Sequence, residues 1–196
     1  MIWLCIKKQK MRNKVAKMKP VKLENAFLMI EKGPVVLIST SCRGKNNIMP
    51  LSWITVIDFT PRFALCTSSW NYSYEALVKT KECVIAIPGV DLIDKVIEAG
   101  NVSGSDTDKF ALCGFETAPS KFISPPLIKD CLGNIECKVV DHIKKHDLFI
   151  LEGVYAWTCA RKESRAFHAV GDGTFIADGR KLNRRKLMLK IPEWLK

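Results

Sequence analysis

A serine and a tryptophan side by side, Ser52 and Trp53, stand in an apolar β-type run over residues 46–67 and could bind a flat aromatic ligand. The indole offers a face for stacking, and the hydroxyl and nearby backbone groups can supply hydrogen bonds from the same place. Pro50 lacks a backbone N–H, so we expect it at a bend or on an unpaired edge. The alternative is that Trp53 only fills the core, as most aromatic side chains do.

Three hydroxyl side chains follow at the next predicted strand-to-helix junction. Ser68, Ser69 and Ser73 stand between that strand and a helix expected over residues 74–79. Hydroxyls and helix N-terminal N–H groups together can hold an anion such as phosphate. Ser73 could also simply cap the helix, and one residue could do both.

The net charge of +11 is concentrated at the two ends of the chain. Residues 1–22 carry eight Lys or Arg and no acidic residue, and residues 180–196 carry seven against Glu193, which leaves residues 23–179 at −3. Basic ends can bind RNA or membrane phosphates, but no aromatic-basic recognition motif accompanies them. We therefore expect solvated tails and treat nucleic-acid binding as unlikely.

The composition is that of a soluble globular protein, with 196 residues, 47% hydrophobic and 26% charged. No apolar run approaches the roughly 18 residues of a membrane helix. The opening MIWLCI is followed at once by lysines, which reverses the charge order of a secretory signal, so a cytoplasmic protein without a membrane partner is expected. We divide the chain into a basic N-terminal extension (1–20), one domain (21–180) and a basic C-terminal tail (181–196).

The eight cysteines contain no C-x-x-C pair, and the closest two, Cys131 and Cys137, are six residues apart. Metal and iron–sulfur sites need short paired spacings. Several cysteines lie in apolar, strand-like runs such as FALCTS. We expect buried, reduced thiols in a reducing cytosol and no metal site.

Short strands outnumber helices in the hydrophobic pattern. Single strands are expected over 34–41 and 82–88. Residues 46–67 are expected to form two strands joined at Thr60-Pro61, with Ser52 and Trp53 inside the first strand. A second hairpin is expected from strands over 134–143 and 148–157. Helices are expected over 23–30, 74–79 and 90–99, a loop over 101–110, and turns on both sides of 174–176. This pattern predicts a mainly β protein, a small antiparallel barrel with flanking helices.

Six short motifs occur in one order along the predicted domain. They are N-x-x-x-x-x-W (Asn47, Trp53), Y-S-Y-E (72–75), S-G-x-x-x-D-K-F (103–110), E-C-K-V-V (136–140), H-x-L-F-I (146–150) and D-G-T-F (172–175). Their order resembles the flavin reductase-like, FMN-binding split-barrel family over roughly residues 20–180. The resemblance implies an FMN-binding split barrel, usually a homodimer with the flavin near the subunit interface.

The resemblance also implies which residues contact FMN: Asn47, Ser52, Trp53, Ser73, Lys109 and Phe175. Trp53 and Phe175 could flank the flavin with apolar area, and Asn47 could satisfy the nitrogen and oxygen edge of the ring. Lys109 could neutralise a phosphate or the charge that develops at the N1/O2 edge on reduction. Its alternative role is that of a solvated loop charge.

One histidine, His146, matches the histidine that the family carries before a strand, with Lys144 and Lys145 here in place of the family's Gly-Asp. It could donate a proton or hydrogen bond during hydride transfer at flavin N5, or only finish a hairpin. His142, four residues earlier, is the alternative.

The reaction implied by the resemblance is flavin redox chemistry. No G-x-G-x-x-G follows a strand, so a Rossmann site is absent and NAD(P)H would bind transiently over the flavin. We expect an NAD(P)H:flavin oxidoreductase. The alternatives are a flavoredoxin-like electron carrier served by a redox protein partner and, more remotely, a basic nucleic-acid-binding module on the same barrel.

Overall fold

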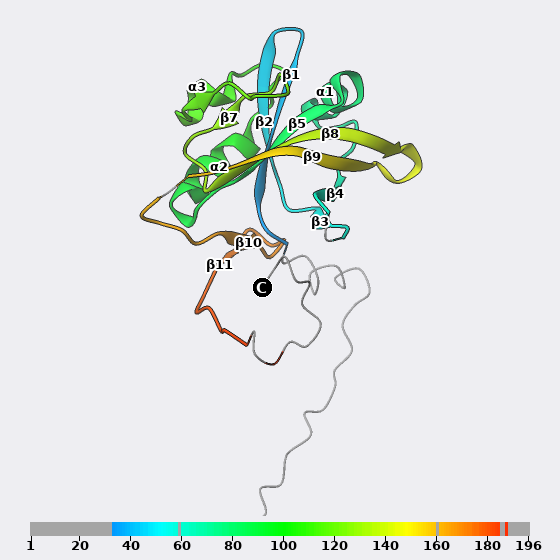
Figure 1. Ribbon diagram of the computed structural model, residues 1–196. Helices are drawn as coiled ribbons and strands as arrows, with labels where there is room; N and C mark the ends of the chain where they lie inside the picture. The colour runs from blue at the N-terminus through cyan, green and yellow to red at the C-terminus, as the bar shows by residue number, and fades with distance from the viewer. Residues whose placement is uncertain (1–32, 59, 160, 185–186, 188–196) are drawn as a thin grey trace, which may run out of the picture.

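Seven antiparallel strands form the main sheet, in the order β2-β1-β5-β8-β9-β4-β3 (Figure 1). The computed structural model describes residues 33–58, 60–159, 161–184 and 187. The strands are β1 (Val36–Cys42), β2 (Lys45–Leu51), β3 (Ile54–Val56), β4 (Arg62–Cys66), β5 (Glu82–Ile87), β8 (Gly133–Ile143) and β9 (Leu148–Thr158). The expected mainly β architecture is confirmed.

The two edges of this sheet, β2 and β3, are joined by only Ser52 and Trp53. A flat sheet of this width would hold its edges roughly 29 Å apart, at about 4.8 Å per strand spacing. A link of two residues spans at most about 10 Å. The sheet must therefore curl until its edges approach, which gives a barrel that is split between β2 and β3.

The expected placement of Ser52 and Trp53 in the middle of one strand is wrong. β2 pairs with β1 and β3 pairs with β4, and between them the Ile54 N–H donates to the Ser52 carbonyl at 2.9 Å in a tight turn. One straight strand could not serve both edges of a curled sheet, so the chain bends between them. Pro50 lies on edge strand β2 as expected, opposite Leu37.

Three helices border the barrel: α1 (Tyr72–Thr80), α2 (Ile93–Asn101) and α3 (Lys109–Cys113). The first two confirm the predicted helices over 74–79 and 90–99, although the second begins with a single 3₁₀ turn, η2 (Val90–Leu92). The short α3 was missed because it begins inside a polar segment. The Asp108 carboxylate accepts from two N–H groups of its first turn, and Gly114 ends it at φ 59°.

Two small ribbons complete the described chain. β6 (Thr117–Ala118) pairs with β7 (Leu127–Ile128), and β10 (Phe167–Ala169) pairs with β11 (Phe175–Ala177). The Val35 N–H donates to the Phe167 carbonyl at 3.0 Å, which ties β10 to the chain just before β1. The predicted helix over 23–30, the basic extension over 1–20 and most of the tail over 181–196 lie outside the described residues.

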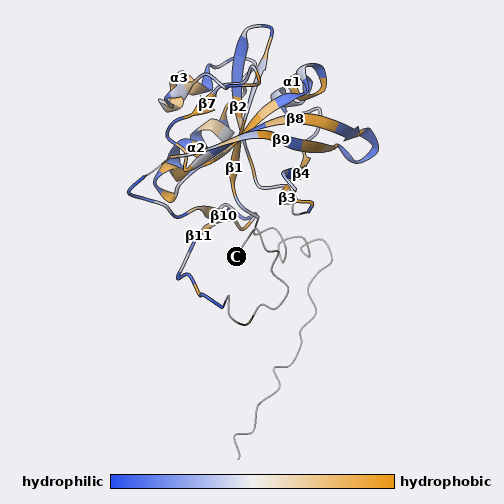
Figure 2. Ribbon diagram, viewed as in Figure 1, coloured by the Kyte–Doolittle hydropathy of each residue, from blue (hydrophilic) through white to orange (hydrophobic). Residues whose placement is uncertain are grey.

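Apolar side chains pack in two core clusters on opposite faces of the strands. Neighbouring residues Leu37 and Ile38 belong to different clusters because successive side chains of a strand point to opposite faces. Burial on both faces explains the unbroken apolar run over residues 35–38, which leads into β1. Figure 2 shows β8 and β9 changing from hydrophobic to hydrophilic toward their hairpin tip. Within the described ranges, no helix is long and apolar enough to cross a membrane.

Candidate ligand-binding site

Two adjoining cavities lie where β2 meets α2 and the segment that follows it. The first, the polar cavity, has a volume of about 290 Å³, and its lining includes Asn47, Asn71, Tyr72, Ser73, Gly104 and Lys109. The second, the apolar cavity, has a volume of about 320 Å³, and its lining includes Val35, Leu51, Ser52, Val96, Ala169 and Phe175. Both contact Pro50 and Gly100, so the two volumes form neighbouring parts of one site.

The side chain of Asn47 is the best-defined polar group of this site. It projects from β2, is only 4% exposed, and its Nδ2 donates to the Ser73 hydroxyl at 2.8 Å. Its Oδ1 is buried and accepts no hydrogen bond from the described residues. Because a buried acceptor normally has a partner, this oxygen is suited to a ligand N–H.

Gly104 provides the close packing on the other side of that oxygen. A Cβ atom at this position would lie 2.2 Å from Asn47 Oδ1 and 2.7 Å from Tyr72 Cδ1. Contacts this short are not tolerated, so only glycine lets the loop after α2 approach β2 and α1. The glycine therefore shapes the polar cavity.

Lys109 supplies a positive charge to the polar cavity. Lys109 is 6% exposed, and its Nζ donates a hydrogen bond to the Ala99 carbonyl at 2.7 Å. That carbonyl lies in the last turn of α2, where the helix dipole favours a cation. Burial lowers the pKa of Lys109, while the neighbouring Cys113 acts in the opposite direction. The ammonium group thus joins α2 to α3, and Lys109 also lines the cavity, which a solvated loop lysine would not do.

The predicted serine cluster is divided by the structure. Ser73 lines the polar cavity, whereas Ser68 is buried, Ser69 is exposed, and neither lines this site. The alternative role of Ser73 as the cap of α1 does not hold, because the helix begins one residue earlier, at Tyr72, and Asn71 takes the N-cap position without a side-chain cap bond. Asn71, which no sequence motif singled out, also lines the polar cavity.

Trp53 and Phe175, the two residues expected to flank a ring, do not line the same cavity. Ser52 and Phe175 both line the apolar cavity. Phe175 packs edge-on against buried Phe167, with ring centroids 5.6 Å apart. Trp53 is 52% exposed and lines neither cavity, so it is not the core filler considered from the sequence.

Neither candidate histidine lines the two cavities. His146 is exposed in the 3₁₀ turn η3 (Lys144–His146) at the tip of the β8–β9 hairpin, which projects on the opposite side of the view from α2 and α3 (Figure 1). His142 is half-buried and stacks on Phe149 at 4.0 Å, with its Nε2 3.4 Å from the Tyr74 hydroxyl. A single chain therefore does not bring His146 to the site.

The cysteines within the described ranges are all free. Cys83 and Cys137 face each other across β5 and β8 in the core, where the adjacent thiol and burial raise the pKa of Cys137. Among the same residues, no three His, Cys, Asp or Glu side chains gather into a possible metal site. As expected, Cys83, Cys113, Cys131 and Cys137 are buried, whereas Cys42, Cys66 and Cys159 are half-buried.

Comparison with known proteins gives a family-model match, described as "Flavin reductase like domain", over residues 30–172. A solved FMN-binding domain of a flavin reductases-like enzyme from Shewanella baltica is 25% identical, with a TM-score of 0.71 over 83% of this chain and 95% of its own. The flavoredoxin of Methanosarcina acetivorans is 22% identical, with a TM-score of 0.74 over 91% of this chain and 100% of its own. The flavoredoxin of Desulfovibrio vulgaris (Miyazaki F) is 23% identical, with a TM-score of 0.72 over 79% and 91%.

Two curated relatives match different extents of the chain. An uncharacterized protein of Archaeoglobus fulgidus is 30% identical over 111 residues, which is 55% of this chain and 63% of the relative. The uncharacterized protein YddH of Escherichia coli is 26% identical over 181 residues, which is 83% of this chain and 96% of the relative. The match thus spans about three fifths of the archaeal protein and nearly all of the bacterial one.

Proposed function

The chain belongs to the flavin reductase-like domain family, and we propose that it binds FMN in the polar and apolar cavities and acts as a flavin-dependent oxidoreductase. The observation that carries the proposal is the buried, unpartnered Oδ1 of Asn47, a residue that lines the polar cavity. A flavin ring carries an N–H donor between two carbonyl acceptors along one edge. Asn47 would accept from that N–H.

The remaining groups of the site fit the same molecule. Phe175 and Pro50 offer apolar area in the apolar cavity for the flat ring. The start of α1 offers backbone N–H groups and the Ser73 hydroxyl in the polar cavity, a suitable environment for the phosphate of FMN. Pro50 and Gly100 line both parts, so one elongated ligand could occupy them together.

The role proposed for Lys109 is electrostatic. FMN supplies the redox chemistry, because its ring accepts a hydride or electrons and passes them on. The Lys109 ammonium would place positive charge beside that ring in a site largely removed from water, where charge interactions are strong. This charge would favour acceptance of electrons by the bound group.

We propose NAD(P)H as the transient electron donor and a cytoplasmic homodimer as the working form. The homodimer matters for the role of His146, because His146 does not line the site of its own chain. A proton-donating or hydrogen-bonding role for His146 therefore requires that a partner chain bring its hairpin tip to the cavity. Exposure of His146 at that tip is compatible with such an arrangement.

A second candidate function is a flavoredoxin-like electron carrier served by another redox protein. It is supported by the similarity of fold to two flavoredoxins. The two functions share the flavin site and differ in the donor. An electron carrier would need no pocket for a nicotinamide nucleotide.

The test is an absorption spectrum of the purified protein with FMN, followed by anaerobic addition of NADH or NADPH. We expect one FMN per chain and bleaching of the flavin bands within seconds. Bound flavin that stays oxidised with both nucleotides but is reduced by a redox protein would assign the carrier function instead. Failure to bind FMN at all would refute both.

A further inference from the structure

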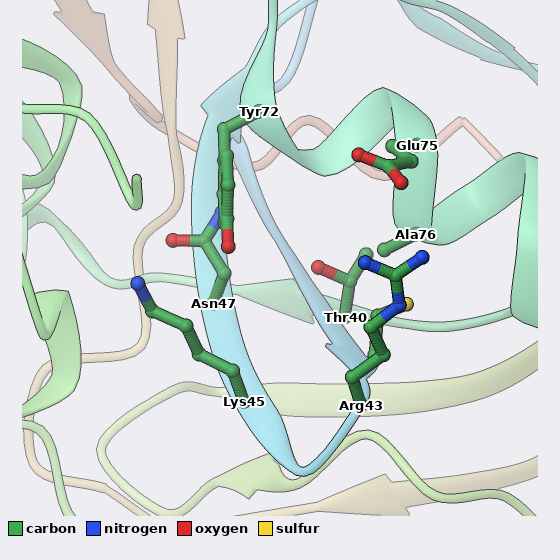
Figure 3. A pocket seen from close by; sticks show the side chains of 8 residues that line it. Thr40, Arg43, Lys45, Asn47, Tyr72, Glu75 and Ala76 are labelled. Carbon is green, nitrogen blue, oxygen red and sulfur yellow. The ribbon is translucent and has the colours of Figure 1, made fainter. Parts of the chain in front are cut away.

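A third cavity, the turn cleft, opens between the β1–β2 turn and α1 and has a volume of about 260 Å³. Figure 3 shows its two walls, with Tyr72, Asn47 and Lys45 on one side and Thr40, Arg43 and Glu75 on the other. No part of the FMN site proposed above needs this space. Its residue types are nevertheless those of a ligand site, with two cations, an aromatic ring and a buried hydroxyl.

The cation at the mouth of the cleft is held there by the backbone. Arg43 and Gly44 form the two-residue turn between β1 and β2, both with positive φ, 53° and 76°. Two consecutive residues with positive φ form a primed β-turn, whose twist matches that of the two flanking strands. Figure 3 shows the Arg43 side chain extending from the turn toward α1, and no described residue makes a hydrogen bond or ion pair with its guanidinium. Its donors are available to a ligand.

The one acidic group of the cleft is already paired. Glu75 contacts Lys79, one helical turn further along α1. The hydrogen bond from Lys79 and the charge of Lys79 lower the pKa of Glu75, and the charge of Arg43 lowers it to a smaller extent. The cleft and its border still carry an excess of positive charge, because Arg43, Lys45 and Lys79 stand against the single carboxylate of Glu75.

Lys45 and Tyr72 connect the cleft to the flavin site. The Lys45 ammonium donates to the Ser105 carbonyl at 3.0 Å and lies 5.3 Å from the centroid of the Tyr72 ring, in cation–π range. Tyr72 and Asn47 line both the turn cleft and the polar cavity. They form a shared wall, so ligands in the two spaces would be immediate neighbours.

We infer that the turn cleft binds the adenosine-phosphate end of a nicotinamide dinucleotide whose other end reaches the polar cavity. This inference rests on the proposed function and names the binding site of its donor. Arg43 and Lys45 would hold phosphate, and the Tyr72 ring would stack with the purine. Because the turn cleft and the polar cavity share a wall, one ligand could place its anionic end at Arg43 and Lys45 and its reactive end next to the flavin.

The direct test is calorimetric titration of the FMN-loaded protein with adenosine 2′,5′-bisphosphate, which carries no nicotinamide. We expect binding, and loss of at least about tenfold in affinity in Arg43→Gln, because a charge-assisted hydrogen bond to the phosphate is removed. Arg62→Gln is the matched control, since Arg62 is an exposed arginine on β4 outside the cleft. Absence of binding to the parent protein, or equal affinity in Arg43→Gln, would overturn the inference.

A second readout does not depend on arginine chemistry. Cys42 lines the cleft and is half-buried, whereas Cys159 is similarly exposed but lies outside it. The bisphosphate should slow alkylation of Cys42 by iodoacetamide and leave the alkylation rate of Cys159 unchanged. Peptide mass spectrometry measures both rates. Equal labelling of Cys42 with and without the nucleotide contradicts the inference.

The two proposals fail in different ways. FMN affinity of Arg43→Gln should equal that of the parent, with KM for the dinucleotide raised and kcat retained. If the parent protein binds FMN but not the bisphosphate, only the assignment of the turn cleft is refuted. If FMN does not bind, the proposed function is refuted whatever the cleft holds.

Discussion

Asn47 and Ser73 are joined by a 2.8 Å hydrogen bond from the Asn47 amide nitrogen to the Ser73 hydroxyl, although 26 positions separate them in the chain. The bond ties β2 to the first turn of α1 and fixes the orientation of the amide. The opposite end of that amide, Oδ1, is left buried and without a partner against Gly104. A structural contact thus leaves an acceptor without a partner on a residue that lines the polar cavity.

Removal of that acceptor should weaken flavin binding. In Asn47→Leu we expect about a tenfold increase in the Kd for FMN, about 1.4 kcal/mol, as for a lost hydrogen bond in a buried site. Quenching of FMN fluorescence measures this, with circular dichroism to confirm folding. Asn46→Ala is the control, because Asn46 is the exposed neighbour on the same strand, and it should bind as the parent does. Equal affinity in Asn47→Leu would remove Asn47 from the site.

Gly104→Ala should close the polar cavity. Its methyl group would displace either the Asn47 amide or the Tyr72 ring, so FMN binding should fall by tenfold or more. Gly179→Ala serves as the control, because a Cβ there meets no atom within 4 Å and Gly179 does not have a positive φ. The same titration measures both variants. Parent-like affinity in Gly104→Ala would mean that the ligand does not use this cavity.

Lys109→Met should make the bound flavin harder to reduce. Loss of a positive charge beside the ring is expected to lower its midpoint potential by about 30 mV or more, the equivalent of about 1.4 kcal/mol for a two-electron couple. Spectroelectrochemistry of the bound flavin measures the shift. Lys95→Met is matched, because Lys95 also donates to a backbone carbonyl, that of Gly114, but lies outside the cavities. A potential equal in both variants would assign Lys109 a structural role alone.

The buried carboxylate of Glu136 should make the fold sensitive to acid. Burial by itself would raise its pKa, but hydrogen bonds from the Lys121 and Phe122 backbone N–H groups and from Trp157 Nε1 outweigh this and lower it below 4.5. A lowered pKa adds stability above pH 4.5 that is lost as the pH falls through the native-state pKa.

Denaturant titrations across this acid range measure the effect. We expect Glu136→Gln to lose about 1–3 kcal/mol at neutral pH, since its amide cannot accept all three bonds. The variant should also lose less stability than the parent on acidification. Parallel pH profiles for the two proteins would show that Glu136 does not carry the effect.

His146 is expected to contribute to the flavin site of the partner chain and not to the site of its own chain. His146→Ala and Asn47→Leu proteins, each defective alone, should regain activity when unfolded, mixed and refolded together, because a hybrid dimer contains one intact site. Sedimentation analysis establishes whether dimers are present. Full activity of His146→Ala on its own would remove the histidine from the reaction and leave it as the end of a hairpin.

The sequence allowed the strand content and the barrel to be predicted because alternating and β-branched runs are local signals. It also identified Asn47, Ser73 and Lys109, which are distant in sequence but line one cavity. Their grouping depended on the order of motifs, since no local pattern encodes a contact between β2 and α1. The bend at Ser52 and Trp53 could not be foreseen, because it follows from sheet closure rather than from residue preferences.

Other features were hidden for physical reasons that differ from case to case. α3 has five residues, too few to show a helical period, although Asp108 and Gly114 mark its two ends. The turn cleft was missed because Arg43 reads as an ordinary turn residue until folding places α1 beside it. The distance of His146 from the site could not be anticipated, because a hairpin motif does not say where its tip projects.

The most direct test of the central claim is a crystal structure of the protein with FMN. We predict the flavin ring in the joined polar and apolar cavities, with a ring N–H within hydrogen-bond distance of Asn47 Oδ1 and Lys109 close to the ring. A flavin bound elsewhere on the protein, with Asn47 Oδ1 still unpaired, would contradict the account.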